Sequence, residues 1–347
     1  MGLHPAVAAV RLAVRRDVPV LDAGNGARWS PHVRDGGCVL VACSGGADSL
    51  ALLAATVFEF RRVDARVIGA VVDHGLQEGS AEHTARVVEQ MAALGVDETA
   101  SIRVHVDVAS SGVEAGAREA RYAALGQLAT HFGADLVLLG HTLDDQAETV
   151  LLGLTRGSGG RSIAGMRRGF HQDGVAFSRP LLGIRRAETE AACRAEGIEF
   201  WVDPHNSDPR FLRSRVRHDV LPVLERELGP GIAETLARTA DQLRRDMESL
   251  DTIASQELGR VRSGEGADLA LALPDELVSE PALSARVLRL AALEAGAPAD
   301  ELFAVHVDAL QRLVEVGRPD KEIQLPGHLT AYLADGHLRF RRTTSLA

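Results

Sequence analysis

The first residues whose types and spacing could do chemistry form a polar run directly behind an apolar one. The apolar run CVLVA at 38–42 leads into Ser44, Gly45, Gly46, Ala47, Asp48 and Ser49, and an apolar helical pattern follows. Paired glycines let a backbone approach an anion closely, and the first N–H groups of a helix favour negative charge. The carboxylate of Asp48 suits such a place if Mg²⁺ lies between it and phosphates. The run predicts a phosphate-binding loop, and the alternative is a capped helix after a tight turn.

A second polar cluster, LGHTLDDQAET at 139–149, also follows an apolar run. Asp145 and Glu148 are three residues apart, so they share one face if the segment is a helix, and His141 precedes them. Two carboxylates at this separation repel each other, which destabilises the folded chain unless a cation neutralises them. That cation could be Mg²⁺ or the ammonium group of an amine. The alternative, a capping box of Thr142 and Asp145, would leave Glu148 and His141 unexplained.

Arginines gather in two further segments. Arg118 and Arg121 lie three residues apart in EAGAREARYAAL, which is typical of the start of a helix. Alternate positions of FLRSRVR are also arginines, namely Arg213, Arg215 and Arg217. This spacing suits the binding of phosphates by guanidinium groups. For Arg118 and Arg121 the alternative is an exposed, ion-paired helix.

Charge is distributed unevenly along the chain. The 347 residues carry a net charge of −10, yet residues 156–217 hold twelve arginines against seven acidic residues. A basic segment can guide a polyanion such as RNA while the rest of the surface repels it, although a solvated arginine-rich surface has the same composition. Lys321 is the only lysine, which excludes a Walker-type Gly-Lys-Ser/Thr loop.

Cysteine usage and hydropathy indicate the compartment. The three cysteines form neither a disulfide framework nor a CxxC pair, so we expect a reducing cytoplasm and no cysteine-bound metal. No stretch reaches roughly 18 uninterrupted apolar residues, which argues against a membrane span.

The elements that must position these residues alternate between strand and helix patterns. Apolar runs at 38–42, 66–72, 102–108 and 135–140 predict strands, and helical patterns separate them. Repeated βαβ units predict an α/β fold with an open parallel sheet, helices on both faces and ligands at the carboxyl ends of the strands. Asp73 and His74 would lie at that edge. We expect a helical N-terminal extension (1–36), a catalytic domain (37–225), a smaller, mostly helical C-terminal domain (226–320) and a small β tail (321–347).

Five stretches together resemble the tRNA(Ile)-lysidine synthases of the PP-loop ATP pyrophosphatase superfamily. They are CSGGADSLAL, VDHGLQEGSAEH, EAGAREARYAAL, LGHTLDDQAETVLLGLTRGSGGRSIAGM and RPLLGIRRAETEAACRAEGIEFWVDPHNSDPRFLRSRVRHDVLPVLE, and they cover most of residues 38–225. The SGGxDS run alone indicates only the superfamily, whereas the last two stretches are narrower. Ser214, where family members often have Asn, and Cys193, where an aromatic residue is expected, depart from the pattern and bear on local tRNA contacts.

The resemblance implies an enzyme that uses ATP and Mg²⁺ to join L-lysine to tRNA(Ile) with a CAU anticodon. ATP adenylates the C2 oxygen of the wobble cytidine and releases pyrophosphate. The ε-amine of lysine then attacks C2, and AMP leaves. The product, lysidine, pairs with adenine and changes the codon specificity from AUG to AUA. A homodimer is plausible.

The resemblance also implies a role for each matching residue. ATP would contact Ser44, Gly45, Gly46, Ala47, Asp48, Ser49, Asp73, His74, Gly140 and His141, with Mg²⁺ on Asp48. The lysine ammonium would be bound by Asp145 and Glu148, one of which could take a proton from the amine. The tRNA would be held by Arg161, Arg167, Arg213, Arg215 and Arg217. The catalytic residues would be Asp48, Asp145, Glu148, Arg118 and Arg121.

Three other functions stay open on the sequence alone. A PP-loop enzyme that thiolates tRNA would need a CxxC cluster or a persulfide cysteine beside the site, and Cys38 and Cys43 fit that need poorly. A small-molecule synthetase of the amidotransferase type would leave the arginine-rich segment without a purpose. A nucleotide sensor without enzymatic activity would not need paired carboxylates at Asp145 and Glu148.

Overall fold

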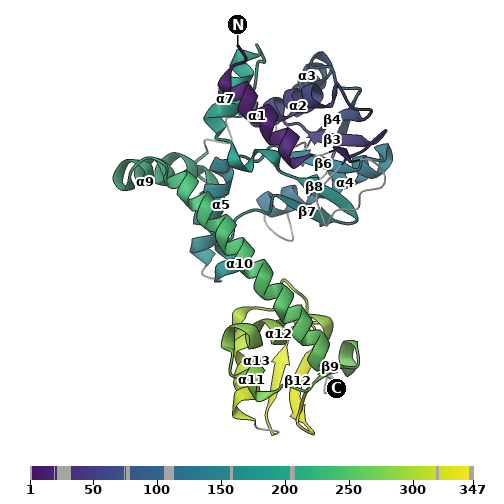
Figure 1. Cartoon of the computed structure of the whole chain (residues 1–347), viewed down its shortest axis with the longest axis vertical. Coiled ribbons are helices and arrows are strands. Elements are labelled where there is room, and N and C mark those ends of the chain that lie inside the picture. The colour runs from purple at the N-terminus through teal and green to yellow at the C-terminus, as the bar shows by residue number, and fades with distance from the viewer. Residues whose placement is uncertain are drawn as a thin grey trace. The chain divides into compact units, whose positions relative to one another are not determined.

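The apolar runs at 38–42 and 135–140 form neighbouring central strands of a six-stranded sheet. The order is β5 (Glu98–Arg103), β4 (Arg66–Asp73), β3 (Cys38–Ala42), β6 (Leu136–Leu139), β8 (Val175–Ser178) and β7 (Gly169–Gln172) (Figure 1). Every neighbouring pair is parallel except β7 with β8. The prediction of an α/β fold with a parallel sheet is therefore confirmed, although β5 begins earlier than the expected strand at 102–108.

Side chains of β3 alternate between two hydrophobic cores, one on each face of the sheet. Val39 and Val41 pack in the core that includes α1 (Pro5–Asp17), α2 (Ala47–Phe60), α3 (Ser80–Ala93) and α7 (Arg186–Ala195). Leu40 and Ala42 pack in the core that includes α4 (Val113–Phe132). Because both faces are covered, the strand has no polar position, which explains its continuous apolar run.

The strand order reverses beside β3. The chain passes from β3 to β4 and β5 on one side and then returns to form β6 on the other side of β3. In open α/β sheets, ligands bind outside the carboxyl ends of the strands at such a reversal. There β3 leads through residues 43–46 into α2, and β6 leads through 140–142 into α5 (Leu143–Arg156). The two polar motifs therefore start from adjacent strands at the same edge.

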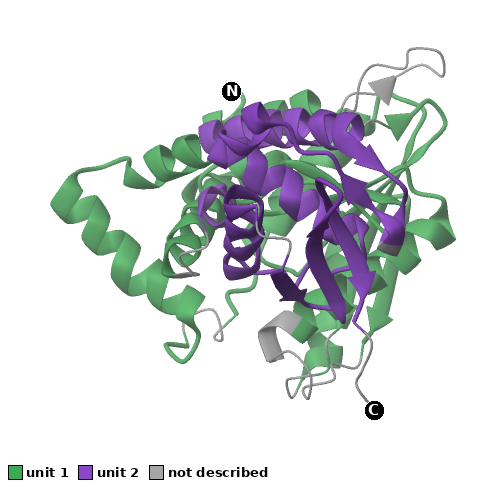
Figure 2. Ribbon diagram, turned by 90° about the horizontal axis from the view of Figure 1, so that it is seen from below, with its two compact units in different colours: residues 1–156, 165–240 green, residues 157–164, 241–347 purple. Residues whose placement is uncertain are grey.

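The computed structural model describes residues 2–18, 20–21, 33–73, 75, 79–104, 113–156, 159–203, 208–317 and 320–343. The chain divides into two units, residues 1–156 with 165–240 and residues 157–164 with 241–347 (Figure 2). The remaining elements of the first unit are β1 (Val20–Leu21), β2 (Val33–Arg34), η1 (Pro180–Gly183), α8 (Leu212–Arg215), the π-helical turn η3 (Val216–Val220) and α9 (Leu221–Leu228). Helix α10 (Ile232–Val261) contributes residues to both units. Among the described helices, none has the length and apolar character needed to span a bilayer.

The second unit contains an antiparallel sheet as well as helices. Its strand order is β11 (Glu322–Leu325), β12 (Leu329–Ala334), β13 (His337–Arg342), β10 (Ala270–Leu271) and β9 (Arg262–Ser263). Its helical elements are α6 (Gly160–Ile163), η4 (Gly266–Asp268), α11 (Asp275–Val278), α12 (Pro281–Glu294) and α13 (Ala304–Val316). The expectation of a mostly helical C-terminal domain is therefore wrong.

The sequence indicates one part of this sheet, the hairpin of β12 and β13, and gives no sign of β9 and β10. Strands β9 and β10 are two residues long, too short to produce an alternating pattern. The hairpin of β12 and β13 is apparent in the sequence because its turn contains Asp335 and Gly336, which both have positive φ.

Candidate functional site

The phosphate loop, residues 43–46, joins β3 to α2. Gly45 has a φ of +80°, and a Cβ there would lie 2.7 Å from Cγ2 of Val87, so the position requires glycine. The hydroxyl of Ser49 accepts a hydrogen bond from the N–H of Ser44 at 3.1 Å and donates one to the carbonyl of Gly46 at 2.9 Å. The first turn of α2 therefore holds the loop in one shape.

Gly140 brings the end of β6 against this loop. A Cβ at Gly140 would lie 3.1 Å from backbone atoms of Asp48 and Ser49. Only a residue without a side chain lets β6 approach the first turn of α2 so closely. The close approach sets His141 beside the phosphate loop.

A cavity of about 440 Å³ covers this edge of the sheet. The predicted ATP-binding residues that line it are Ser44, Gly46, Ala47, Asp48, Ser49, Gly140 and His141. Trp201 closes another side, where its backbone N–H donates to the carbonyl of Gly45 at 2.9 Å and its ring centroid lies 4.1 Å from that of His83. The cavity therefore combines a phosphate-binding loop with a partly aromatic wall.

Asp73 is not among the described residues that line this cavity. The carboxylate of Asp73 accepts from the N–H of Gly75 at 2.9 Å and pairs with Arg103 at 2.7 Å. Burial would raise the pKa of Asp73, but the hydrogen bonds from Gly75 and Arg103 hold it below its usual value. These contacts tie the last residue of β4 to Gly75 and Arg103. His74 lies outside the described residues.

Asp145 at the start of α5 uses its two oxygens differently. Oδ2 accepts from the N–H and the hydroxyl of Thr142, at 2.9 and 3.0 Å, so one of the two hydrogen bonds of the capping box considered from the sequence is present. Oδ1 accepts from Arg186 at 2.9 Å and from Arg217 at 3.1 Å. Burial would raise the pKa of Asp145, but Arg186 and its other partners lower it to about 2. Asp145 is therefore both a cap and a charged group of the cavity.

Glu148 lies one turn further along α5, and its side chain is fully buried. Arg217 donates to both of its oxygens, at 2.6 and 2.9 Å. Arg186 and Arg213 lie 3.6 and 3.5 Å from the same carboxylate. A buried carboxylate requires such partners, because an unpaired charge there would be strongly unfavourable.

Arg186, near the start of α7, connects three carboxylates and was not identified from the sequence. Its guanidinium group lies 3.2 Å from Asp48, 2.9 Å from Asp145 and 3.6 Å from Glu148. Burial would lower the pKa of Arg186, but these carboxylates raise it. The hydroxyl of Thr189, one turn later, also donates to Asp48. The sequence gives no spacing signal for this cluster, since Arg186 is 41 residues from Asp145.

His141 borders the cavity as a neutral ring. Its Nδ1 accepts from Nε of Arg179 at 3.2 Å. Burial, together with the charge of Arg179, lowers the pKa of His141 to about 3. At physiological pH the imidazole therefore carries no charge.

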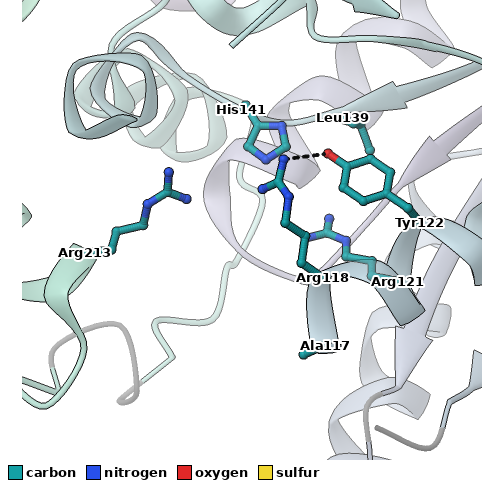
Figure 3. Close-up of a pocket in the computed structure, with 7 residues that line it drawn as sticks. All are labelled: Ala117, Arg118, Arg121, Tyr122, Leu139, His141 and Arg213. Atoms are coloured by element: carbon teal, nitrogen blue, oxygen red, sulfur yellow. Dashed lines mark hydrogen bonds between the residues drawn. The ribbon is translucent and has the colours of Figure 1, made fainter. Parts of the chain in front are cut away.

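Arg118 and Arg121 line a smaller pocket of about 240 Å³ with Ala117, Tyr122, Leu139, His141 and Arg213 (Figure 3). Arg118 and Arg121 project from α4, and Arg213 lies on the opposite side. Arg118 also donates to the hydroxyl of Tyr122 at 3.4 Å. Among the residues that the structure describes, three arginines and no carboxylate border this pocket, which suits an anion or an electron-rich base.

The other predicted tRNA-binding arginines fall in different places. Arg213 and Arg217 are one helical turn apart and both face Glu148, whereas Arg215 between them donates to the backbone carbonyls of Pro209 and Arg210. Two further arginines lie elsewhere. Arg161 pairs with Asp251 at 2.6 Å in the second unit, and the carbonyl of Arg167 accepts from Arg179.

The carboxylates at the cavity suit a metal ion that is bound partly by the protein and partly by the phosphates of a nucleotide. Within the described ranges, no three histidine, cysteine or acidic side chains are arranged to hold a metal ion. Mg²⁺ is usually bound through one or two carboxylates, water and substrate phosphates. Asp48 at the cavity wall can supply one such carboxylate, and a nucleotide would supply the phosphate oxygens.

Comparison with known proteins places these features in a family context. Residues 27–224 match the family model described as the PP-loop domain. The tRNA(Ile)-lysidine synthase of Streptomyces coelicolor is 46% identical over 99% of this chain and 100% of its own length. The enzyme of the same name from Thermobifida fusca is 48% identical over 97% of this chain and 98% of its own length.

One solved structure shares the fold at low sequence identity. It is the U34-tRNA thiolase of Methanococcus maripaludis with its [4Fe-4S] cluster, with a TM-score of 0.55 and 18% identity. The match covers 69% of this chain and 78% of the thiolase.

Proposed function

The chain belongs to the tRNA(Ile)-lysidine synthase family, and we propose on that basis that it joins L-lysine to the wobble cytidine of tRNA(Ile) with a CAU anticodon, using ATP. One observation supports this function more than any other. The nucleotide-sized cavity and the arginine-lined pocket adjoin, because His141, Arg121 and Arg213 border both. A nucleotide and a second, electron-rich substrate can therefore meet beside the carboxylates of α5.

The first step joins the C2 oxygen of the cytidine to the α-phosphorus of ATP and releases pyrophosphate. The glycine-rich loop and the hydroxyls of Ser44 and Ser49 suit the pyrophosphate. Asp48 would hold Mg²⁺, which neutralises phosphate charge when bound. Arg118 and Arg121 would receive the base and stabilise the charge that develops on it.

The second step joins the ε-nitrogen of lysine to C2, breaks the bond from C2 to the oxygen that carries AMP, and removes a proton from the amine. Of the two carboxylates of α5, Asp145 lines the cavity and Glu148 lies behind it, so Asp145 is the one of this pair that a lysine ammonium would meet. Arg186 and Arg217 already neutralise both carboxylates. The ammonium must therefore displace one guanidinium group or share Oδ1 of Asp145 with it.

Transfer of sulfur to tRNA is the competing function, since the similar fold of the thiolase permits it. Thiolation requires an accessible cysteine or cluster beside the nucleotide. Cys38, Cys43 and Cys193 are buried free thiols, and none lines either cavity. Burial, with the nearby charge of Asp48, raises the pKa of Cys193 to about 12, which makes it a poor nucleophile. The three free thiols and the proposed tRNA substrate are both consistent with an enzyme of the cytoplasm.

The direct test is incubation of the protein with ATP, radiolabelled lysine and unmodified tRNA(Ile) bearing CAU. We expect label in acid-insoluble RNA, with one AMP formed per lysine joined. Omission of ATP, or use of methionine tRNA with the same anticodon, provides the controls. Folded protein that incorporates no label, or that transfers sulfur instead, would rule the proposal out.

A further inference from the structure

Arg179 is a buried arginine just before η1, and its donors are directed to three acceptors. Only 4% of the surface of Arg179 is exposed to solvent. Nε donates to Nδ1 of His141 at 3.2 Å, Nη2 to the hydroxyl of Tyr122 at 3.0 Å, and Nη1 to the carbonyl of Arg167. The guanidinium group also lies 4.4 Å from the ring centroid of Phe170. This network fixes the side chain of Arg179 and, through it, the ring of His141.

The chemistry of the two side chains fixes the proton on His141. A guanidinium group has five N–H donors, no acceptor, and stays protonated in proteins. Nδ1 of His141 must therefore present a lone pair to Arg179. A neutral imidazole whose Nδ1 is an acceptor carries its hydrogen on Nε2.

The charged groups around the ring support the neutral state. Besides Arg179, the groups that act on His141 are Arg118 and Arg121 from α4 and Asp145 from α5. Burial is the largest cause of the lowered pKa of His141, and the three guanidinium groups add to it against one carboxylate. An imidazolium would also direct an N–H of Nδ1 against the donor of Arg179.

Nε2 of His141 is left for a ligand. Among the residues that the structure describes, the ring of His141 makes its hydrogen bond with Arg179 alone. His141 borders both the larger cavity and the arginine-lined pocket. A donor at this junction lies where the two substrates of an adenylation would meet.

We propose that Arg179 is a positioning residue that holds His141 as a neutral donor, and that Nε2–H of His141 hydrogen-bonds an oxygen of the reacting substrates. The ligand class is an anionic or carbonyl oxygen, such as a phosphate oxygen of the nucleotide or the oxygen of the base. His141 is thus a fixed donor and not a general base. The identity of the reacting oxygen rests on the proposed function, whereas the tautomer rests only on the contacts of Arg179.

The tautomer can be observed by ¹H–¹⁵N NMR of the full-length protein labelled at histidine. His141 is assigned by the signal that disappears in His141→Gln. We expect an unprotonated Nδ1 and a protonated Nε2 throughout the neutral range. An imidazolium, or a protonated Nδ1, in the wild-type protein would overturn the proposal.

Two variants separate the effect of Arg179 from that of its surroundings. Arg179→Met removes the donor and should give a mixed tautomer that titrates at higher pH. Tyr122→Phe is the matched control, because it removes another acceptor of Arg179 and should leave the His141 signals unchanged. An unchanged tautomer in a folded Arg179→Met protein would show that Arg179 does not set it.

The hydrogen bond to substrate is tested by kinetics. Loss of one fixed donor to a developing oxyanion typically lowers kcat about 10²–10³-fold, so His141→Ala should lose that much tRNA-dependent AMP formation. His141→Asn, which keeps an N–H donor, should recover part of it. The pH profile of kcat should lack a histidine ionisation, and an acidic limb that disappears in His141→Asn would identify a base instead. If NMR shows the tautomer but no lysine is joined to tRNA, the proposed function fails and the assignment of Arg179 stands.

Discussion

Glu148 and Arg217 form a two-point ion pair in which the carboxylate is fully buried and the N···O distances are 2.6 and 2.9 Å. Breaking a buried pair by removing one partner costs about 3–5 kcal/mol, because the other charge is left uncompensated. We therefore expect Glu148→Gln to lower the free energy of unfolding by about that amount. Urea denaturation measures it.

The matched control for this substitution is Glu98→Gln. Glu98 pairs with Arg66 at 2.9 Å, but both side chains are about half exposed. Exposed pairs contribute about 0–1 kcal/mol. Equal losses from the two substitutions would contradict a structural role for the pair of Glu148 and Arg217.

Glu148 should also separate the two chemical steps. In Glu148→Ala, tRNA-dependent exchange of pyrophosphate into ATP should persist, because the phosphate loop is intact. Lysine transfer should fall further, because Arg186 and Arg217 would lose one of the two carboxylates that they share and compete with the lysine ammonium for Asp145. Exchange and transfer are measured on the same preparation, below its unfolding temperature. An equal loss of both would argue against a role for Glu148 in the lysine step.

Asp145 should give the protein an acid-labile component of stability. Its pKa of about 2 in the folded state lies below the value of about 3.9 expected in the unfolded chain. A lowered carboxyl pKa stabilises the folded state above the unfolded pKa, and this stability is lost as pH falls through the folded pKa. Asp145→Asn should therefore cost about 2–3 kcal/mol near neutral pH, with the difference shrinking between about pH 4 and pH 2. Urea denaturation across this range checks it, and a difference independent of pH would show that the charge is not responsible.

The strand and helix patterns of the sequence predicted the two polar motifs of the site and the edge of the sheet at which they lie. The apolar runs of β3 and β6 placed both polar motifs at one edge of a sheet, as the strand order confirms. The spacing of Asp145 and Glu148 placed them on one helix face. Arg213, Arg215 and Arg217 were predicted together because they occupy alternate positions. The segment is helical, so residues four apart share a face, and only Arg213 and Arg217 contact Glu148.

The partners that come from distant segments were not predictable in the same way. Arg179 is 38 residues from His141, and Arg186 is 138 residues from Asp48. No periodicity connects residues across separate strands and helices. Only the fold, which brings β8 and α7 to the edge formed by β3 and β6, makes these contacts possible.

Gly45 and Gly140 should tolerate no side chain, for two different reasons. Gly45→Ala would place a Cβ 2.7 Å from Val87 at a φ of +80°, and Gly140→Ala would place one 3.1 Å from the backbone of Asp48. Both should displace the phosphate loop and weaken ATP binding tenfold or more, which corresponds to about 1.4 kcal/mol. Isothermal titration with ATP measures the change. Gly126→Ala in α4 is the control, since nothing lies within 4 Å of its added Cβ, and unchanged affinity in all three variants would refute the assigned geometry.

Asp48 should be essential to nucleotide cleavage at the α-phosphorus. Its carboxylate lines the cavity at the first turn of α2, and burial raises its pKa while Arg186 and Thr189 oppose that rise. Asp48→Ala should abolish pyrophosphate exchange at every Mg²⁺ concentration, because the carboxylate that would meet the metal is gone. Thr189→Val removes only the hydroxyl that donates to Asp48, so it should keep exchange with an altered Mg²⁺ dependence. Chromatography of the nucleotide products supplies the decisive reading: the wild-type protein should release AMP, and release of ADP would mean that the loop does not hold pyrophosphate as a leaving group.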